Sequence, residues 1–179
     1  MNTRRALLFI PIILALVLGA FLFKGLSLNP RELPSALVGK PFPAFELSAL
    51  QDQAKQLTKV DLPKQPHLVN IWATWCPSCK VEHPQLLSIA RDDNIPIVGL
   101  NYKDTAPEAQ KWLRVYENPY VFNIFDPKGK LGFDLGVYGA PETYIVDAKG
   151  IVRYRHAGPI DVETWKTMRN IVRDLEREG

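Results

Sequence analysis

Cysteine is scarce in this sequence: Cys76 and Cys79 are the only two among 179 residues. There is therefore no second C-x-x-C motif to complete a four-cysteine zinc site, and no cysteine beside the N-terminal apolar stretch to carry a lipid. Basic runs interleaved with aromatic residues are also absent, and the formal net charge is only +3, which argues against a nucleic-acid partner. Internal repeats and low-complexity tracts do not occur. What remains is a chain with 46% hydrophobic residues, long enough for one domain plus an anchor.

The longest apolar stretch, residues 6–23, contains no charged residue. Its length of about 18 residues is close to what an α-helix needs to cross a bilayer. It exceeds the roughly 7 to 15 residues of a typical signal-peptide core. We therefore expect an uncleaved transmembrane signal-anchor at residues 6–23. A cleaved signal peptide and a buried core helix are the alternatives.

Positive charges set the expected orientation of this stretch. Arg4 and Arg5 precede it, and the positive-inside rule keeps residues 1–5 in the cytoplasm. The rest of the chain is then expected on the outer side of the inner membrane, in the periplasm of a Gram-negative cell. It comprises a proline-containing linker at residues 24–38 and a folded domain at residues 39–179. Because that compartment is oxidising, a dedicated electron donor is needed to keep the two cysteines reduced.

The cysteines lie where a predicted strand meets a predicted helix. Residues 68–72 form a short apolar run typical of a buried strand, and apolar residues follow Cys79 with helical spacing. A helix N-terminus carries unpaired N–H groups and partial positive charge, and this lowers the pKa of a cysteine placed there. We predict that Cys76 is the nucleophile and that Cys79, about one turn later, resolves the mixed disulfide. Pro77 fits the first helical turn, where its missing N–H costs nothing.

Two other uses of the cysteines compete with this interpretation. A purely structural disulfide would close a loop too small to restrain the unfolded chain much. A zinc site could draw on Cys76, Cys79, His83 and His67, because a histidine soon after C-x-x-C is a ligand-like spacing. That site lacks a second C-x-x-C, and His67 lies outside any motif.

The other patterns predict an alternating α/β order. Strands are expected at residues 95–102 and 121–125, with a helix at residues 106–118 between them. Together with the strand and helix around the cysteines, this gives β-α-β-α-β with right-handed crossovers. In the middle helix, Trp112 and Tyr116 are expected to be core residues.

Shorter elements are expected on either side of this unit. An edge strand at residues 45–47 is expected to pair with residues 57–62, and residues 144–147 and 151–155 are expected to form a hairpin. Asp161 is expected to cap a final helix. The expected buried face of this helix consists of Val162, Trp165, Met168, Val172 and Leu175.

Two motifs resemble known families. Trp-Ala-Thr-Trp-Cys-Pro-Ser-Cys (72–79) resembles the W-C-x-x-C signature of the thioredoxin superfamily. Gly-Val-Tyr-Gly-Ala-Pro-Glu-Thr (136–143) is similar to the G-V-x-G-x-P-E-T fingerprint of the DsbE (CcmG) thiol:disulfide interchange family. The resemblance extends over the whole chain. It implies a thioredoxin-like α/β fold, with a central mixed sheet flanked by helices and one N-terminal transmembrane helix, and no cofactor besides the Cys76–Cys79 disulfide.

The resemblance also implies a second half of the site. It places Ala140 and Pro141 in a loop that faces the cysteines, with Pro141 in the cis form and the preceding backbone able to hydrogen-bond a substrate strand. Trp75 and Pro77, on either side of Cys76, complete the set of residues that we expect to bind the substrate.

Glu142 is the expected catalytic acid. Thioredoxins carry a buried aspartate at the position that matches Asn70, and an asparagine cannot take up a proton. If Glu142 lies close to the cysteines, it can exchange protons in place of that aspartate, and its charge raises the pKa of the cysteine. Glu82, one helical turn past Cys79, is expected to be a second acid in the groove; a solvated helix residue is the alternative.

The resemblance implies a disulfide reductant that acts in cytochrome c maturation. The implied partners are an apocytochrome c, or a carrier that holds it in a mixed disulfide, and a membrane electron donor of the DsbD/CcdA type. A general periplasmic disulfide reductase or oxidant is an alternative with the same fold. A non-catalytic, membrane-tethered module that binds haem or an apoprotein is an alternative of another class. A peroxidase of the peroxiredoxin kind is disfavoured, because such enzymes set a single peroxidatic cysteine in a different motif.

Overall fold

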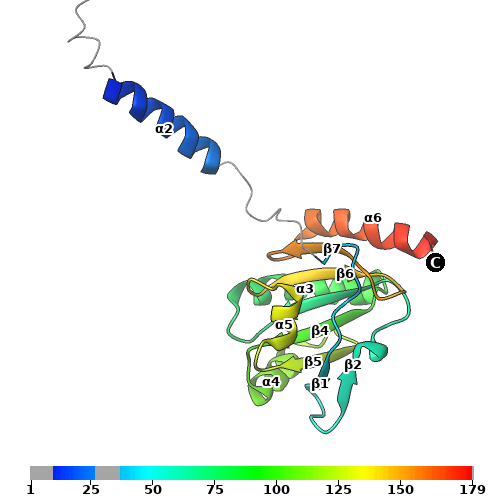
Figure 1. Ribbon diagram of the computed structural model, residues 1–179. Helices are drawn as coiled ribbons and strands as arrows, with labels where there is room; N and C mark the ends of the chain where they lie inside the picture. The colour runs from blue at the N-terminus through cyan, green and yellow to red at the C-terminus, as the bar shows by residue number, and fades with distance from the viewer. Residues whose placement is uncertain (1–9, 27–36, 179) are drawn as a thin grey trace, which may run out of the picture. The chain divides into compact units, whose positions relative to one another are not determined.

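The structure, a computed structural model, describes residues 10–26 and 37–178, which belong to two units that divide between Leu33 and Pro34 (Figure 1). The first unit contains helix α2 (Ile10–Leu26), in which the side chains of residues 11–24 are exposed. Within the described ranges, no helix combines the length and apolar character needed to cross a membrane. The predicted cytoplasmic residues 1–5, the start of the predicted span and most of the predicted linker lie outside the described residues.

The second unit is built on a five-stranded sheet in the order β5-β4-β3-β6-β7. The three strands β3, β4 and β5 are parallel, and β6 and β7 are antiparallel to their neighbours. The mixed central sheet predicted by the family resemblance is therefore confirmed. The strand bounds are β3 (His67–Trp72), β4 (Ile97–Tyr102), β5 (Phe122–Asp126), β6 (Glu142–Val146) and β7 (Val152–Ala157).

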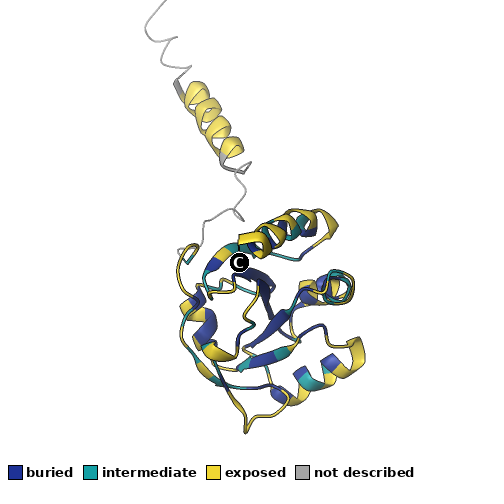
Figure 2. Cartoon of the chain, turned by 90° about the vertical axis from the view of Figure 1, so that its right-hand side faces the viewer, coloured by how far each residue is buried: buried dark blue, intermediate teal, exposed yellow. Residues whose placement is uncertain are grey.

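Strand β3 is the middle strand of the five, and all six of its residues are buried, on both faces of the sheet. Helices α3 (Pro77–Asp92), α4 (Ala106–Tyr116) and α6 (Val162–Glu178) pack their apolar sides into one core on the same face, as Figure 2 shows. Two parallel right-handed crossovers that step in one direction along the sheet require α3 and α4 to share a face. Asp161 caps α6 through a hydrogen bond from the Thr164 N–H, as predicted.

The opposite face carries a second core, formed with α5 (Lys130–Leu135) and the N-terminal part of the domain. There, β1 (Glu46–Ser48) pairs with β2 (Gln56–Thr58), which confirms the predicted edge pairing. The segment before β1 joins the domain edge, because the Gly39 and Phe42 N–H groups donate to Val152 O and Gly150 O.

Three expectations from the sequence need correction, and one helix was missed. Residues 57–62 do not continue as a strand, because a short 3-10 helix (Lys59–Asp61) begins after Thr58. Helix α5 was not predicted at all. Val162 is 60% exposed, although the other four residues of the predicted α6 face are buried. Trp112 is half-buried and Tyr116 is exposed, because α4 turns part of its apolar stripe away from the core.

Candidate active site

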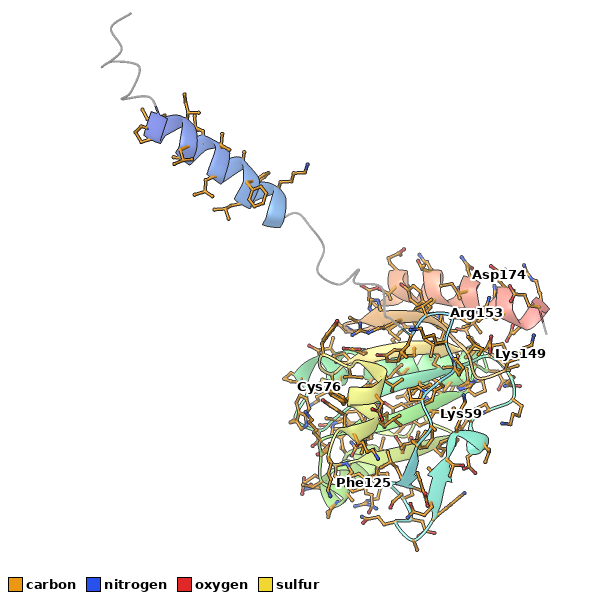
Figure 3. All side chains as sticks on the ribbon, in the orientation of Figure 1. Lys59, Cys76, Phe125, Lys149, Arg153 and Asp174 are labelled. Atoms are coloured by element: carbon orange, nitrogen blue, oxygen red, sulfur yellow. A yellow bond between two sulfur atoms is a disulfide. The ribbon has the colours of Figure 1, made fainter. Side chains whose placement is uncertain are left out.

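The redox turn follows directly from the central strand. Strand β3 ends at Trp72, and helix α3 begins at Pro77, so Cys76 is the N-cap residue. Cys76 and Cys79 form a disulfide with an S–S distance of 2.07 Å and a Cα–Cα distance of 5.3 Å; Figure 3 labels Cys76. The chain is thus in its oxidised form, and the pair lies at a strand-to-helix turn, as the sequence predicts.

The start of α3 can stabilise a negative charge on Cys76 once the disulfide is reduced. Its Sγ accepts a hydrogen bond of 3.1 Å from the Cys79 N–H, one of the N–H groups that the helix itself leaves unpaired. In the reduced protein, the same N–H and the positive end of the helix favour the thiolate of Cys76 over the thiol. Pro77 and Ser78 are exposed, whereas Cys76 is only 4% and Cys79 only 2% exposed. A partner can therefore reach the pair only by docking closely around it.

The cis-proline loop lies beside the redox turn. The Ala140–Pro141 peptide bond is cis, as the family resemblance implies. The antiparallel register pairs Ile71 with Glu142, so Pro141 enters the sheet next to the end of β3. Pro141 itself is buried and Ala140 is partly exposed. The structure therefore brings the two predicted halves of the site together at one edge of the sheet.

Trp75 is held in place although its ring is exposed. Its Nε1 donates a hydrogen bond of 3.0 Å to Lys103 O, and 52% of the residue is accessible. The preceding residue is fixed as well, because the backbone N–H and the hydroxyl of Thr74 each donate to the Asp104 carboxylate at 2.7 Å. Trp75 therefore offers a pre-positioned aromatic surface next to Cys76.

Glu82 is buried on the core side of the redox helix. It is 1% exposed, and its spacing of three residues from Cys79 places the two side chains on the same face of α3. Asn70 Nδ2 donates to one carboxyl oxygen at 3.0 Å, and the Ile160 N–H donates to the other at 2.9 Å. Burial raises the pKa of Glu82 from 4.5 to about 7, and the two hydrogen bonds only partly oppose this effect. Glu82 can therefore gain or lose a proton near neutral pH.

The amide of Asn70 connects Glu82 to a wider buried network. Its Oδ1 accepts a hydrogen bond of 2.9 Å from the Tyr120 hydroxyl, and its Nδ2 also donates to Thr143 Oγ1 at 3.0 Å. Burial raises the pKa of Tyr120 well above its usual value, so this hydroxyl remains a neutral donor. Within this network, Glu82 is the group that titrates near neutral pH.

The carboxylate of Glu142 contacts the loop before the cis proline and strands β6 and β7. It forms a salt bridge of 2.8 Å with Arg155, and both side chains are almost fully buried. It also accepts hydrogen bonds from the Tyr138 N–H at 2.8 Å and from the Tyr144 hydroxyl at 3.3 Å. These contacts tie the loop before the cis proline to strands β6 and β7.

The side chain of Glu142 points in a different direction from the network around Asn70 and Glu82. Side chains alternate along β6; Thr143 faces Asn70, whereas Tyr144, two residues after Glu142, belongs to the second core. The cysteines belong to the first core. Proton exchange between Glu142 and the cysteines stays a prediction, and the contacts themselves give Glu142 a part in holding the loop.

The two histidines of the alternative zinc site contact backbone carbonyls instead. His67 Nδ1 lies 2.8 Å from Gln65 O, and His83 Nε2 lies 2.9 Å from Tyr116 O at the end of α4. Within residues 10–26 and 37–178, no three His, Cys, Asp or Glu side chains converge as metal ligands would.

Three contributors to the site were missed by sequence reasoning. Asp104 holds Thr74, Tyr120 orients Asn70, and Arg155 pairs with Glu142. Only Arg155 had a usable signal, because it belongs to the predicted hairpin; in the observed register it lies opposite Tyr144, two residues beyond Glu142 on the same face.

Comparison with known proteins agrees with this geometry. The Redoxin family model matches residues 37–174. A thiol:disulfide interchange protein DsbE from Pseudomonas aeruginosa is 53% identical over 163 residues, which cover 91% of this chain and 90% of that protein. The DsbE of Escherichia coli K12 is 46% identical over 170 residues and covers 91% of both chains.

Solved structures show the same fold at lower identity. A thio-disulfide isomerase from Thermus thermophilus superposes with a TM-score of 0.63 at 25% identity, over 75% of this chain and 96% of that one. A secreted thiol-disulfide isomerase from Corynebacterium glutamicum gives a TM-score of 0.65 at 21% identity, over 76% of this chain and 85% of that one. The thioredoxin-like fold, the C-x-x-C disulfide and the identity to these relatives lead to one conclusion: the chain belongs to the redoxin family and, within it, to the DsbE thiol:disulfide interchange proteins.

Proposed function

We propose that this protein reduces the haem-attachment disulfide of apocytochromes c, directly or through a carrier that holds the apocytochrome in a mixed disulfide. The observation that carries the proposal is the Cys76–Cys79 disulfide at the start of α3, beside cis-Pro141, in a chain of the DsbE family. A c-type haem-attachment site has the sequence C-x-x-C-H. Oxidation of its two cysteines gives the kind of disulfide that a C-x-x-C dithiol can reduce.

The exchange proceeds in two steps. The Cys76 thiolate attacks one sulfur of the partner disulfide, a mixed disulfide forms, and the other partner sulfur leaves as a thiolate that takes up a proton. Cys79 then loses its proton and attacks Cys76 Sγ, which releases the second partner thiolate. Two electrons have moved to the partner, and the pair is left as the disulfide seen here.

Several residues assist these steps in the proposal. Glu82 takes the proton from Cys79, because it lies on the same helix face and has a pKa of about 7. Trp75 and Pro77 contact the partner beside Cys76, and the backbone at Ala140 and Pro141 pairs with the partner strand. Glu142 is proposed both as the loop-holding residue and as a further proton-exchanging acid.

The proposed setting is the periplasmic side of the inner membrane. Residues 6–23 serve as an uncleaved anchor, residues 1–5 stay in the cytoplasm, and residues 24–38 link the anchor to the domain at residues 39–179. The charge-free apolar composition of residues 6–23 supports this arrangement. A membrane dithiol donor of the DsbD/CcdA type then returns two electrons to the disulfide after each cycle.

The redox potential of the pair tests the direction of the reaction. We expect the purified full chain to equilibrate with a glutathione or dithiothreitol buffer at about −200 mV or lower, the range of reductants. The reduced chain should also reduce an oxidised C-x-x-C-H peptide, and Cys76→Ala should abolish this. A potential near about −120 mV, typical of a strong oxidant, would overturn the proposal.

A further inference from the structure

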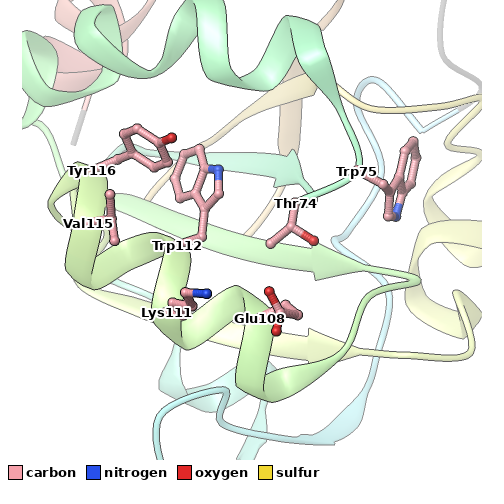
Figure 4. A pocket seen from close by; sticks show the side chains of 7 residues that line it. All are labelled: Thr74, Trp75, Glu108, Lys111, Trp112, Val115 and Tyr116. Carbon is pink, nitrogen blue, oxygen red and sulfur yellow. The ribbon is translucent and has the colours of Figure 1, made fainter.

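A groove extends from the redox turn along helix α4 (Figure 4). Its volume is about 460 Å³. Thr74 and Trp75 form the end next to Cys76, and Trp112, Val115 and Tyr116 of α4 form the rest of its apolar lining. We refer to this surface as the α4 groove.

Three large apolar or aromatic side chains are exposed along the α4 groove. Val115 is 63% exposed, Trp75 52% and Tyr116 36%. Of these three residues, Trp75 was expected at the substrate-binding surface and Tyr116 in the core. Large apolar and aromatic side chains gathered on a surface mark binding sites, and Trp and Tyr are the residues that most often dominate interfaces.

The aromatic walls are held in place before any partner binds. The Trp112 ring lies 5.0 Å from the rings of Trp72 and Tyr116, and His83 packs edge-on against it at 4.4 Å between centroids. Because these rings are fixed by the fold, little side-chain entropy is lost when they are covered.

Charge distinguishes the two ends of the α4 groove. Glu108 and Lys111 are both exposed, and neither forms a salt bridge within the part of the chain that the structure describes. Glu108 belongs to the first turn of α4 and lies nearer to Thr74 in Figure 4, whereas Lys111 is one turn further along. A basic side chain close to the reacting sulfur therefore meets a complementary charge.

The α4 groove continues the surface on which a disulfide partner has to lie. The sheet order places the cis-proline loop on the β6 side of β3, and α4 on the side of β4 and β5. Since Cys76 is 4% exposed, a partner that reaches it covers its surroundings on both sides.

We propose that the α4 groove binds the polypeptide segment that follows the reacting cysteine of the partner, with an apolar side chain against Trp75 and Trp112 and a basic side chain beside Glu108. This inference rests on the proposed function. In a C-x-x-C-H site, the histidine after the second cysteine, or a lysine beyond it, supplies the basic side chain.

Charge reversal tests the proposal with oxidised C-x-x-C peptides that carry either a lysine or a glutamate after the motif. For Glu108→Lys in the full chain, we expect kcat/KM for the lysine peptide to fall about fivefold and that for the glutamate peptide to rise. Val115→Asn should weaken both peptides, through KM. Glu176→Lys, an equal charge reversal on α6, is the matched control and should change neither.

A small aromatic disulfide, too short to reach the α4 groove, distinguishes a failure of the proposed function from a failure of the proposed role of the groove. If the wild-type chain reduces neither this compound nor the peptides, the proposed function is wrong. If the wild-type chain reduces both the compound and the peptides normally, two results would overturn the proposed role of the α4 groove alone. One is that Glu108→Lys changes the reduction of the two peptides equally. The other is that Glu176→Lys has the same effect as Glu108→Lys. Self-association of the wild type that Glu108→Lys abolishes would show a second copy as the occupant and would also overturn it.

Discussion

Asn70 donates a hydrogen bond of 3.0 Å to Glu82, on the buried side of the redox helix. The amide orientation is fixed, because Tyr120 donates to its oxygen while Thr143 and Glu82 accept from its nitrogen. A side chain that cannot titrate thus positions one that can. The buried acid that titrates near neutral pH lies on the same helix as the cysteines, whereas the strand before them carries the asparagine.

The stability of the folded chain should depend on pH through Glu82. Glu82 binds its proton up to about pH 7 in the folded chain, but only up to about 4.5 when unfolded. Between these values the folded state holds the extra proton, so stability falls as pH rises, by at most about 1.4 kcal/mol per pH unit, and then levels off. Urea unfolding of the oxidised chain across this range should show the slope. Glu82→Gln should remove it, and an unchanged slope in this variant would contradict the assignment.

Asn70→Asp should lower the free energy of unfolding by an amount that depends on pH. The substitution replaces two donated hydrogen bonds with a second buried carboxyl group facing Glu82, so one of the two acids has to hold a proton. We expect a loss of about 1–3 kcal/mol in unfolding free energy at low pH and a larger loss in mildly alkaline solution. The same loss throughout the pH range would show that the two carboxyl groups do not interact.

Gly99→Ala should disrupt the support of the strand that carries the redox turn. An added Cβ would lie 2.0 Å from Asn123 Oδ1 and 2.9 Å from Trp72 Nε1, two atoms that share a hydrogen bond of 2.9 Å. We expect a destabilisation of about 2–4 kcal/mol, measured by denaturant unfolding, from overpacking and the lost bond. Gly139→Ala is the control: nothing lies within 4 Å of its added Cβ, and its effect should stay within about 0.5 kcal/mol.

Glu142→Gln separates the two roles proposed for this acid. If Glu142 exchanges protons with the pair, reductase turnover falls and the thiol titration of Cys76 moves to lower pH, because a nearby negative charge is lost. If Glu142 only holds the loop, the titration stays in place and KM for peptide disulfides rises. Unchanged turnover together with an unchanged titration would rule out a catalytic role.

The Arg155 partner provides a further check on Glu142. Arg155→Met leaves a buried carboxylate without its cation, so we expect a loss of about 3–5 kcal/mol in unfolding free energy. The double variant Glu142→Gln/Arg155→Met should recover part of this loss, because neither charge then remains buried. Strictly additive losses would show that the two side chains do not depend on each other.

Local patterns predicted the elements that rest on short-range regularity. The apolar run of β3, the hairpin of β6 and β7 and the cap at Asp161 are all encoded within a few residues. Helix α5 escaped prediction because its six residues, between two glycines with positive φ, are too few to show a helical period.

The features of the site that depend on residues distant in the sequence were harder to predict. Glu82 is buried because it bonds to Asn70 and to the Ile160 N–H, which lies 78 residues further along the chain. The helical spacing of Trp112 and Tyr116 was real, but a stripe of apolar residues does not reveal how much of it the sheet will cover. The cis form of Pro141 was predicted from the family resemblance, because no local sequence pattern indicates it.

The near-complete burial of Cys76 and Cys79 has a kinetic consequence. A small thiol in solution gains no docking energy from the surface around the pair, whereas a partner of the right shape does. The rate of electron transfer into and out of the pair is then set by surface recognition, and its redox state can stay far from equilibrium with the surrounding thiol pool. Selectivity of this kind requires no unusual potential, because molecules that do not fit the surface around the pair exchange electrons with it more slowly.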